Sequence, residues 1–445
     1  MGFFNFKYFN KNTVEINQLY ELYLRYPDIS TDSRCIKKNS IFFALRGENF
    51  DGNNFARDAL RNGAAYAVID KSQDNPDNRF ILVENSLQTL QTLANHHRRA
   101  CDTRLLAITG SNGKTTTKEL IRRILSKKYK VYATQGNLNN HIGVPLTLLS
   151  IPHDTQFGVI EMGANHTGEI RHLCEIAEPD FGLITNVGKA HLEGFGSLED
   201  IAKAKAELFN YLKNNQGTIF GNVSDSNVYS IIPENYNNTV LYGNKGSICW
   251  GEYLSSDPFL KLILFINDDR SGLKINTNLV GRYNLENVIA AATFAHFLNI
   301  GNKIIKRAVE NYFPEENRSQ LIKTGNNSIY MDAYNANPTS MKAALDDFIE
   351  LNVKDKYFIL GEMLEVGEAT DKEHQSLLNF LKEKEILNVL CVGKAFHKHA
   401  NKLGYKYFDN LDEISEYLKN SKIINANIFI KGSRANKLEK LVPFL

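Results

Sequence analysis

The sequence predicts a multidomain α/β protein built on mostly parallel sheets. At 445 residues the chain is too long for one hydrophobic core, which indicates about two to four domains. Strand, loop and helix patterns alternate from Arg104 onward, and a second alternation begins near Tyr312. Such alternation is typical of a parallel sheet covered by helices. We therefore expect three domains, spanning residues 1–102, 103–311 and 312–445.

The first hundred residues mix short strands and turns and end in a longer helix. Residues 40–45 and 65–69 are apolar and aromatic, a composition that favours strands. A helix is expected from Asn85 to Ala100, because leucines recur there at helical spacing. The predicted N-terminal domain is therefore a mixed α/β domain.

The two later domains follow from their alternating patterns. In the central domain, strands are predicted at 105–108, 157–160 and 181–184, a helix at 115–127 and a β-rich stretch at 217–280. This pattern predicts a doubly wound, mostly parallel sheet. The C-terminal strands are predicted at 328–331, 357–360, 389–392 and 428–430. The third domain is therefore expected to be a Rossmann-like α/β domain.

The strongest local signal is the segment Thr109-Gly-Ser-Asn-Gly-Lys-Thr-Thr-Thr117. Gly110 and Gly113 would let backbone N–H groups converge on phosphate oxygens at the start of a helix. Lys114 would neutralise phosphate charge, and Thr115 could offer its hydroxyl to Mg²⁺. The alternative is an ordinary glycine-rich turn with a surface lysine. The strand before and the helix after favour a phosphate-binding loop (P-loop).

Two further side chains follow the ends of predicted strands in the same domain. Glu161 comes after the strand at 157–160, and His191 comes soon after the strand at 181–184. Ligands collect beyond the carboxyl ends of strands in such sheets, so these groups and the P-loop can share one edge. Considered alone, Glu161 could instead be a solvated acid, and His191 could be a structural histidine.

Lys203 and Lys205 lie among alanines in a short helical pattern at 201–209. Such an alanine-rich setting is unusual for two solubilising charges. One surface lysine and one lysine facing phosphate is the simpler interpretation.

Composition narrows the classes of function. A net charge of +2 is too small to indicate, by itself, that the protein binds nucleic acid or a membrane surface. The five cysteines are scattered and form no C-x-x-C pair, which argues against a disulfide framework and a zinc site. No apolar run approaches the ~20 residues of a membrane span, and residues 1–6 contain no signal-like apolar stretch. A cytoplasmic protein is expected.

Motifs along nearly the whole chain resemble the Mur ligase family, in the family's own order. Any one of them is weak, but together they are very specific. They lie at 30–34, 42–52, 109–117, 135–145, 160–165, 186–196, 202–205, 281–287, 317–318, 332–338 and 431–434.

The resemblance implies an ATP-dependent ligase of peptidoglycan precursor synthesis. It would join D-alanyl-D-alanine to UDP-N-acetylmuramoyl-tripeptide through an acyl phosphate, with ATP and Mg²⁺ as cofactors. The N-terminal domain would bind the UDP-sugar, and the protein is expected to be monomeric. The third peptide residue, lysine or diaminopimelate, stays open.

The resemblance also assigns roles to individual residues. The catalytic positions would be Lys114, Glu161, His191 and Lys205. The ATP contacts would be Gly110, Ser111, Asn112, Gly113, Lys114, Thr115, Thr116, Asn284, Arg318 and Asp332. The substrate contacts would be Ser33, Arg34, Asn137, Asn140, His141, Asn335 and Asn337. Magnesium would be held by Thr115, Glu161, His191 and, if carbamoylated, Lys205.

Three other activities remain as alternatives. The family member that adds the third peptide residue carries an Asp-Asn-Pro-Arg motif in its last domain, which is missing here. Folylpolyglutamate synthase usually lacks a long domain before the P-loop. A regulatory module would hydrolyse ATP without ligating anything. The motif at 332–338 favours the enzyme that adds the dipeptide.

Overall fold

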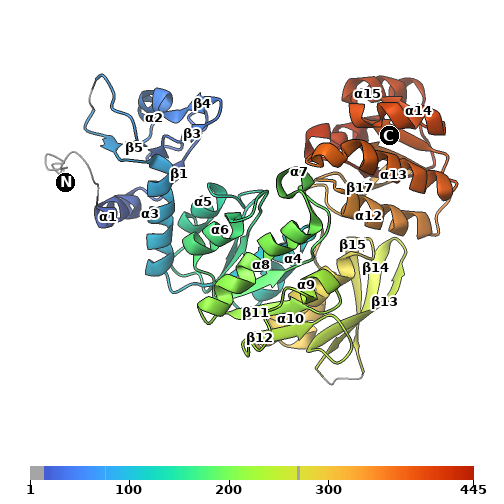
Figure 1. The fold of residues 1–445 in the computed structure, drawn as a ribbon, viewed down its shortest axis with the longest axis horizontal. Helices are drawn as coiled ribbons and strands as arrows, with labels where there is room; N and C mark the ends of the chain where they lie inside the picture. Colours follow the sequence, from blue (N-terminus) through green and yellow to red (C-terminus); the bar gives the residue numbers. More distant parts are fainter. Residues whose placement is uncertain (1–14, 76, 268–270) are drawn as a thin grey trace. The chain divides into compact units, whose positions relative to one another are not determined.

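The computed structural model describes residues 15–75, 77–267 and 271–445. Residues 1–6, where a signal-like stretch was sought, lie outside the described residues. Two compact units emerge from the contacts within the chain (Figure 1). The first contains Met1–Ala107, Tyr129–Gly163 and Glu169–Asp180, and the second contains Ile108–Lys128, Ala164–Gly168 and Phe181–Leu445.

The N-terminal part of the first unit is a small parallel sheet with helices packed on it. Its four strands run in the order β1-β2-β5-β6, and each neighbouring pair is parallel. The side chain of Asn85 caps the longest helix by accepting a hydrogen bond from Gln88 N. The bounds are α1 Ile16–Arg25, β1 Ile29–Ser30, β2 Ile41–Phe43, β3 Arg46–Gly47, β4 Phe50–Asp51, η1 Gly52–Phe55, α2 Ala56–Arg61, β5 Tyr66–Ile69, β6 Phe80–Leu82 and α3 Ser86–Ala100.

The central sheet has six strands in the order β12-β11-β10-β7-β9-β8. The pairs β8–β9, β10–β11 and β11–β12 are parallel, and their residues are mostly apolar and buried, as strands covered on both faces require. The strands are β7 Arg104–Thr109, β8 Val131–Ala133, β9 Phe157–Glu161, β10 Phe181–Ile184, β11 Thr218–Asn222 and β12 Thr239–Tyr242. The helices are α4 Lys114–Leu125, α5 Gly143–Leu149, α6 Glu169–Ala177, α7 Leu192–Phe195, α8 Leu198–Asn214, α9 Ser226–Tyr229, α10 Asn284–Phe297 and α11 Asn302–Glu310.

The predicted β-rich stretch contains an antiparallel sheet of three strands (Figure 1). These are β13 Cys249–Ser256, β14 Phe259–Ile266 and β15 Leu273–Val280. Residues of β14 alternate between buried and less buried positions, and α10 packs against β13 and β14. The alternation arises because one face is covered and the other is solvated.

The C-terminal sheet has the order β16-β17-β21-β18-β19-β20 and is parallel except for β16. One apolar cluster lies under α12, α13 and α14, and a second lies under α15, on the other side of the sheet (Figure 1). This is the Rossmann-like α/β arrangement predicted for the third domain. The bounds are β16 Gln320–Thr324, β17 Asn327–Asp332, α12 Pro338–Glu350, β18 Lys356–Gly361, η2 Gly367–Ala369, α13 Thr370–Glu383, β19 Val389–Val392, η3 Lys394–Phe396, α14 His397–Leu403, β20 Lys406–Phe408, α15 Leu411–Asn420, β21 Asn427–Lys431, η4 Arg434–Asn436 and η5 Leu438–Phe444.

Helix α12 is tied to the loop before α10 by Asp347. One carboxylate oxygen of Asp347 accepts hydrogen bonds from Arg282 N at 2.5 Å and Tyr283 N at 3.4 Å. Burial is the main cause that raises the pKa of Asp347 from 3.8 to about 6. The fold therefore favours the protonated form. The stability that this group contributes is complete below pH 4 and is lost as the pH rises through 6.

We expect Asp347→Asn to stabilise the second unit at pH 8 relative to the wild type, and to have little effect at pH 4. The gain at pH 8 should be about 1–2 kcal/mol, reduced from the full shift because the side chain is partly exposed. Urea unfolding at both pH values measures this difference. Asp346→Asn is the control, because it removes only a surface pair with Lys342 and should change stability by less than about 1 kcal/mol at either pH. An equal effect of Asp347→Asn at both pH values would contradict the proposed link between the raised pKa of Asp347 and the pH dependence of stability.

Candidate functional site

The predicted P-loop is a tight turn between β7 and α4. Gly110 and Gly113 have φ values of 143° and 79°, which L-residues with a side chain rarely adopt. A β-carbon at Gly110 would overlap Thr185 Oγ1, and one at Gly113 would overlap Asn287 Oδ1. Both glycines are therefore required by backbone conformation and by close packing.

The turn is fastened to the segment after β10. Ser111 N donates to Asn186 O at 3.0 Å, and Asn112 N donates to Asn186 Oδ1 at 2.9 Å. Ser111 Oγ donates to Gly188 O at 2.8 Å. These N–H groups of Ser111 and Asn112 are thus used within the protein. The turn leads directly into the N-terminal end of α4, and a helix N-terminus favours an anion.

Lys114 is the first residue of α4, and its ammonium group lies over the loop. Its Nζ donates to Gly110 O at 2.7 Å. The side chains of Thr115 and Thr116, which follow it, are buried. The apolar stripe that buries this helix includes Leu120, Ile121 and Ile124, as the sequence predicts. An anion at the helix start would meet the lysine charge and the positive end of the helix dipole together.

Helix α10 supports the loop through two asparagines one turn apart. Asn287 Nδ2 donates to Asn284 Oδ1 at 2.9 Å, and Asn287 Oδ1 accepts from Thr117 Oγ1 at 3.1 Å. Asn284 also donates to Ser319 Oγ at 3.1 Å. The predicted ATP contact Asn284 is thus buried and engaged within the protein. Asn287 was not assigned a role from the sequence, although its i,i+3 spacing from Asn284 places both on one helix face.

The other two predicted nucleotide residues lie near the start of the C-terminal sheet. The Arg318 guanidinium lies over the Tyr334 ring, 3.4 Å from its centroid. Asp332 Oδ2 accepts from Lys431 Nζ at 2.5 Å, and these two residues are paired across β17 and β21. Two of the recognised motifs, at 332–338 and 431–434, therefore meet in this ion pair.

Residues of the C-terminal sheet domain reach the P-loop. Asn337 caps α12 and donates from Nδ2 to Asn112 Oδ1 at 2.8 Å. His191 Nδ1 lies 2.8 Å from Glu365 Oε2, although the two groups are not aligned as a hydrogen bond. This contact is the largest of the causes that lower the pKa of Glu365, and Lys114 adds to it. Glu365 was missed from the sequence, because nothing near it in the chain indicates its partner.

Lys203 and Lys205 have different environments on α8. Lys203 is exposed and pairs with Asp200 at 3.0 Å. Lys205 is only 2% exposed, and its Nζ lies 5.4 Å from the centre of the Phe195 ring. The structure therefore places Lys203 at the surface, as the simpler interpretation expects, and buries Lys205.

In the first unit, Glu161 is buried at the end of β9. Its Oε1 accepts from Asn139 Nδ2 at 2.9 Å, and its N–H donates to Thr134 Oγ1 at 3.0 Å. Asn139 also accepts from Gly163 N through its backbone carbonyl. Asn139 is thus a further polar residue at this strand end. Its membership of the motif at 135–145 is the sequence signal that could have found it.

The predicted contacts to the UDP-sugar and its peptide are polar residues on loops of the first unit. Arg34 forms a 2.7 Å ion pair with Asp32, two residues before it, and Ser33 lies between them, half-buried. Asn137, Asn140 and His141 are exposed in the segment before α5. Asn140 Oδ1 accepts from Gly143 N at 2.8 Å and so fixes the start of that helix.

Two of the predicted magnesium residues carry oxygen donors, the kind that a hard cation prefers. Within the described ranges, no group of three or more His, Cys, Asp or Glu side chains is placed to hold a metal ion. Magnesium usually keeps several waters and uses one or two carboxylates together with substrate phosphates. The hydroxyl of Thr115 and the carboxylate of Glu161 are donors of that kind.

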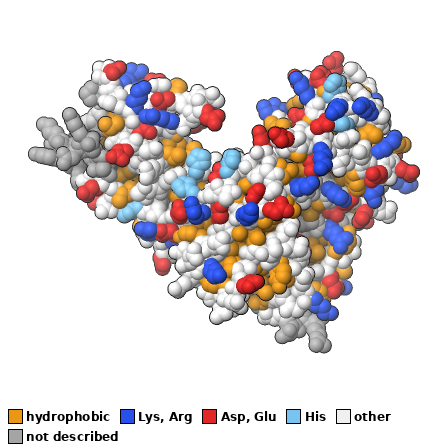
Figure 2. Space-filling view, viewed as in Figure 1, with side chains coloured by type: hydrophobic (Ala, Val, Ile, Leu, Met, Phe, Trp, Pro, Cys, Tyr) orange, Lys and Arg blue, Asp and Glu red, His pale blue; other side chains and the backbone are white. Residues whose placement is uncertain are grey.

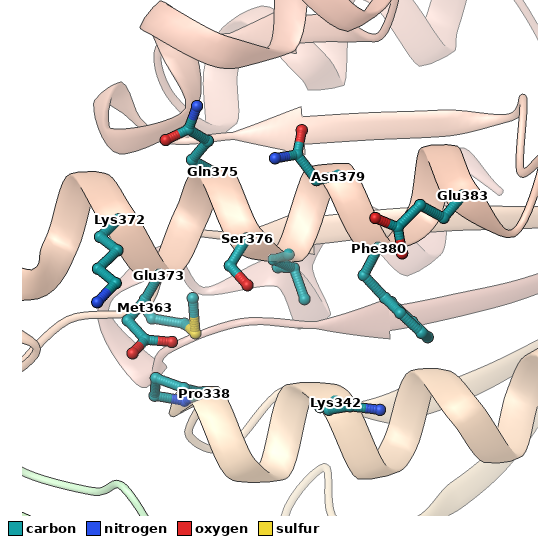
Figure 3. A pocket seen from close by; sticks show the side chains of 11 residues that line it. Pro338, Lys342, Met363, Lys372, Glu373, Gln375, Ser376, Asn379, Phe380 and Glu383 are labelled. Carbon is teal, nitrogen blue, oxygen red and sulfur yellow. The ribbon is translucent and has the colours of Figure 1, made fainter.

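Two pockets of similar size lie among the described residues of the C-terminal sheet domain. One, of about 470 Å³, lies between α12 and α13 and is shown in Figure 3. Lys342, one of the basic residues that line it, extends over the Phe380 ring, with its Nζ 4.8 Å from the ring centroid. The other pocket, of about 550 Å³, includes Asn335 and Glu365 in its lining.

Acidic and basic side chains are interspersed over the face shown in Figure 2. This agrees with the small net charge of the sequence. Among the residues that the structure describes, no helix combines the length and apolar character needed to cross a bilayer.

Comparison with family models matches three consecutive stretches of the chain. Residues 26–98 match the Mur ligase family catalytic domain, residues 108–295 the Mur ligase middle domain, and residues 317–434 the Mur ligase, glutamate ligase domain. The UDP-N-acetylmuramoyl-tripeptide–D-alanyl-D-alanine ligase of Bacillus subtilis is 34% identical over 446 residues, covering 94% of this chain and 92% of that protein.

Solved structures of MurF ligases are also similar to this chain. The MurF structure from Acinetobacter baumannii superposes with a TM-score of 0.84 at 30% identity, covering 93% of this chain and 92% of that one. The MurF ligase from Thermotoga maritima in complex with ADP has a TM-score of 0.83 at 26% identity, covering 95% and 97%. The three-domain α/β architecture expected from the sequence is confirmed.

Proposed function

Because the chain belongs to the Mur ligase family, we propose that it joins D-alanyl-D-alanine to UDP-N-acetylmuramoyl-tripeptide at the expense of ATP, in peptidoglycan precursor synthesis. One observation supports the proposal independently of the similarity to known ligases. Asn337 and Glu365, from the C-terminal sheet domain, contact Asn112 of the P-loop and His191 after β10. A ligase needs a second structural element beside its phosphate site to deliver the second substrate, whereas ATP hydrolysis alone does not.

The chemistry joins a carboxylate and an amine in two steps. The tripeptide carboxylate attacks the γ-phosphorus of ATP, and the bond to ADP breaks, which leaves an acyl phosphate. The amine of D-alanyl-D-alanine, after losing its proton, attacks the acyl carbon, and inorganic phosphate leaves as the amide forms. The first step brings two negatively charged groups together. Its barrier is therefore lowered mainly by charge neutralisation and in-line positioning.

Each predicted residue has a role in that scheme. The N–H groups at the start of α4 and the Lys114 ammonium hold the β- and γ-phosphates. The other contacts to ATP would come from Asn284, Arg318 and Asp332. Magnesium would be held by Thr115, Glu161, His191 and a carbamate on Lys205, and when bound would neutralise phosphate charge. The substrate contacts would be Ser33, Arg34, Asn137, Asn140, His141, Asn335 and Asn337.

We also propose the domain boundaries. Residues 1–102 would form the UDP-sugar-binding domain, residues 103–311 the ATP-binding domain, and residues 312–445 the Rossmann-like C-terminal domain. The reaction belongs in the cytoplasm, where ATP and UDP-sugars are both available. Closure of the C-terminal domain would exclude water from the acyl phosphate.

Phosphate release from ATP tests the proposed function. We expect turnover only when UDP-N-acetylmuramoyl-tripeptide and D-alanyl-D-alanine are both present. Parallel assays with tripeptides ending in lysine and in diaminopimelate identify the third residue. Release of phosphate without either substrate would support a nucleotide-cycling regulator instead. Turnover with a dipeptide acceptor and a free amino acid in place of D-alanyl-D-alanine would favour the enzyme that adds the third residue.

A further inference from the structure

Ser319 lies in the link between α11 and β16, which joins the central domain to the C-terminal sheet domain. It is buried, and its φ of 49° is left-handed, a conformation that persists in a serine where neighbouring groups fix it. Its carbonyl accepts from Val280 N at 3.3 Å, at the end of β15. Its N–H donates to Asp332 Oδ1 at 3.4 Å, at the end of β17. The backbone of Ser319 is therefore bonded to both domains.

The hydroxyl of Ser319 is shared by two side chains from the start of α10. Asn284 Nδ2 donates to Ser319 Oγ at 3.1 Å, and Tyr283 Oη lies at hydrogen-bond distance, 3.0 Å, from the same oxygen. Asn284 Oδ1 accepts from Asn287, which orients the Asn284 amide with Nδ2 toward Ser319. Thr117 Oγ1 donates to Asn287 in turn. One chain of hydrogen bonds thus runs from α4, the helix that follows the predicted P-loop, to Tyr283.

The three residues expected to contact ATP outside the P-loop all adjoin Ser319. Asn284 bonds to its side chain, Asp332 accepts from its backbone N–H, and Arg318 precedes it in the chain. Arg318 is itself held against the Tyr334 ring, 3.4 Å from the ring centroid. The relative positions of these three groups therefore depend on where Ser319 is held.

Tyr283 holds Ser319 from the central domain while its ring packs on the C-terminal sheet domain. The ring lies against the apolar cluster under α12, α13 and α14. Burial is the main cause that raises the pKa of Tyr283 well above 10, and Asp332 adds to it. The phenol therefore keeps its proton at neutral pH. A packed ring that ends in a protonated hydroxyl gives Ser319 Oγ a fixed partner.

We propose that Tyr283 and Ser319 are positioning residues for ATP, in which the Tyr283 hydroxyl holds Ser319 so that Asn284, Arg318 and Asp332 stand at the spacing the nucleotide requires. This rests on the proposed function, which gives those three residues their contacts to ATP, and it adds two residues that act through them. Neither would touch the reacting atoms. Loss of either hydroxyl should therefore weaken nucleotide binding and leave the chemical step intact.

Tyr283→Phe tests the tyrosine, because it removes one oxygen and keeps the packed ring. We expect the Kd of ADP and the KM for ATP to rise about 3–10-fold, the range expected for one hydrogen bond. The kcat should stay within about twofold of the wild type, and KM for D-alanyl-D-alanine should not change. Isothermal titration with ADP and magnesium measures binding, and phosphate release measures the kinetic constants.

Ser319→Ala tests the oxygen that Tyr283 and Asn284 share, and should weaken ADP binding about tenfold. Ser319→Gly removes the same oxygen but adopts the left-handed conformation more readily, so it should fold and show a similar loss. The double variant Tyr283→Phe/Ser319→Ala should lose no more than Ser319→Ala alone, because Tyr283 acts through Ser319. Independent effects would multiply instead.

Tyr405→Phe is the matched control. Tyr405 is buried inside the C-terminal sheet domain, and its hydroxyl donates to Ile386 O at 3.0 Å. The substitution therefore removes a tyrosine hydroxyl bond of the same length away from the predicted ATP contacts. It should lower the melting temperature about as much as Tyr283→Phe does, but leave the Kd of ADP at the wild-type value.

Wild-type ADP affinity in Tyr283→Phe, or losses that multiply in the double variant, would overturn the positioning roles. An equal loss of ADP affinity in Tyr405→Phe would also overturn them, because it would indicate general destabilisation. The binding measurements need no ligation. A protein whose variants bind ADP as expected here, but whose wild type does not ligate D-alanyl-D-alanine, would overturn the proposed function and leave the positioning roles standing.

Discussion

Lys114→Ala is expected to lower ligase turnover by about 10³-fold or more while the protein stays folded. The Lys114 ammonium lies over the predicted P-loop, 2.7 Å from Gly110 O, where it would meet the phosphates of ATP. Its charge offsets the repulsion between the attacking carboxylate and the γ-phosphate, a repulsion that is greatest in the transition state. Phosphate release with all three substrates measures the loss, and thermal unfolding checks the fold.

Lys127→Ala is the control for that variant. Lys127 is exposed just beyond the C-terminal end of the same helix, α4, so its removal lowers the net charge equally without touching the loop. It should leave turnover within about twofold of the wild type. Near-normal phosphate release by Lys114→Ala would refute the role given to the loop lysine.

Lys205→Ala is expected to lower turnover by at least about 10²-fold, and added bicarbonate should not restore it. The reason is the proposed carbamate, which would turn a buried amine into an oxygen donor for magnesium. Turnover at saturating magnesium, together with the magnesium concentration that gives half-maximal rate, measures the effect. Lys205→Met keeps the volume of this 2% exposed side chain and separates lost chemistry from a cavity.

Lys203→Ala provides a matched control on the same helix. Lys203 is solvent-exposed and pairs only at the surface with Asp200, so its loss should cost little stability and no activity. The two lysines differ in exposure, not in local sequence. If Lys205→Met turns over at the wild-type rate, the carbamate proposal is wrong.

The local parts of the site could be predicted from the sequence. The turn at 110–113 needs two glycines because of its backbone conformation, and the strand before it and helix after it follow from hydrophobic pattern. The paired asparagines of α10 share a face because of helical spacing. The antiparallel pairing of β13 to β15 was not predicted, because alternation alone does not specify strand direction.

Contacts between distant segments could not be read from the chain. Glu365 and Asn337 lie more than a hundred residues from His191 and Asn112, and nothing in their local sequence names those partners. The pairing of Asp332 with Lys431 likewise depends on β17 and β21 being neighbours in the sheet. Sheet order is decided by the packing of helices on both faces, which is a property of the whole domain.

The sequence alone thus determined the glycine turn at 110–113, the alternating α/β architecture and the family, because each depends on backbone conformation or on residue spacing within a short window. Only the tertiary structure decided which lysine of α8 is buried, and which acid meets His191. Burial and charge pairing depend on residues that folding brings together. The distance between two such residues along the chain does not indicate whether they are in contact.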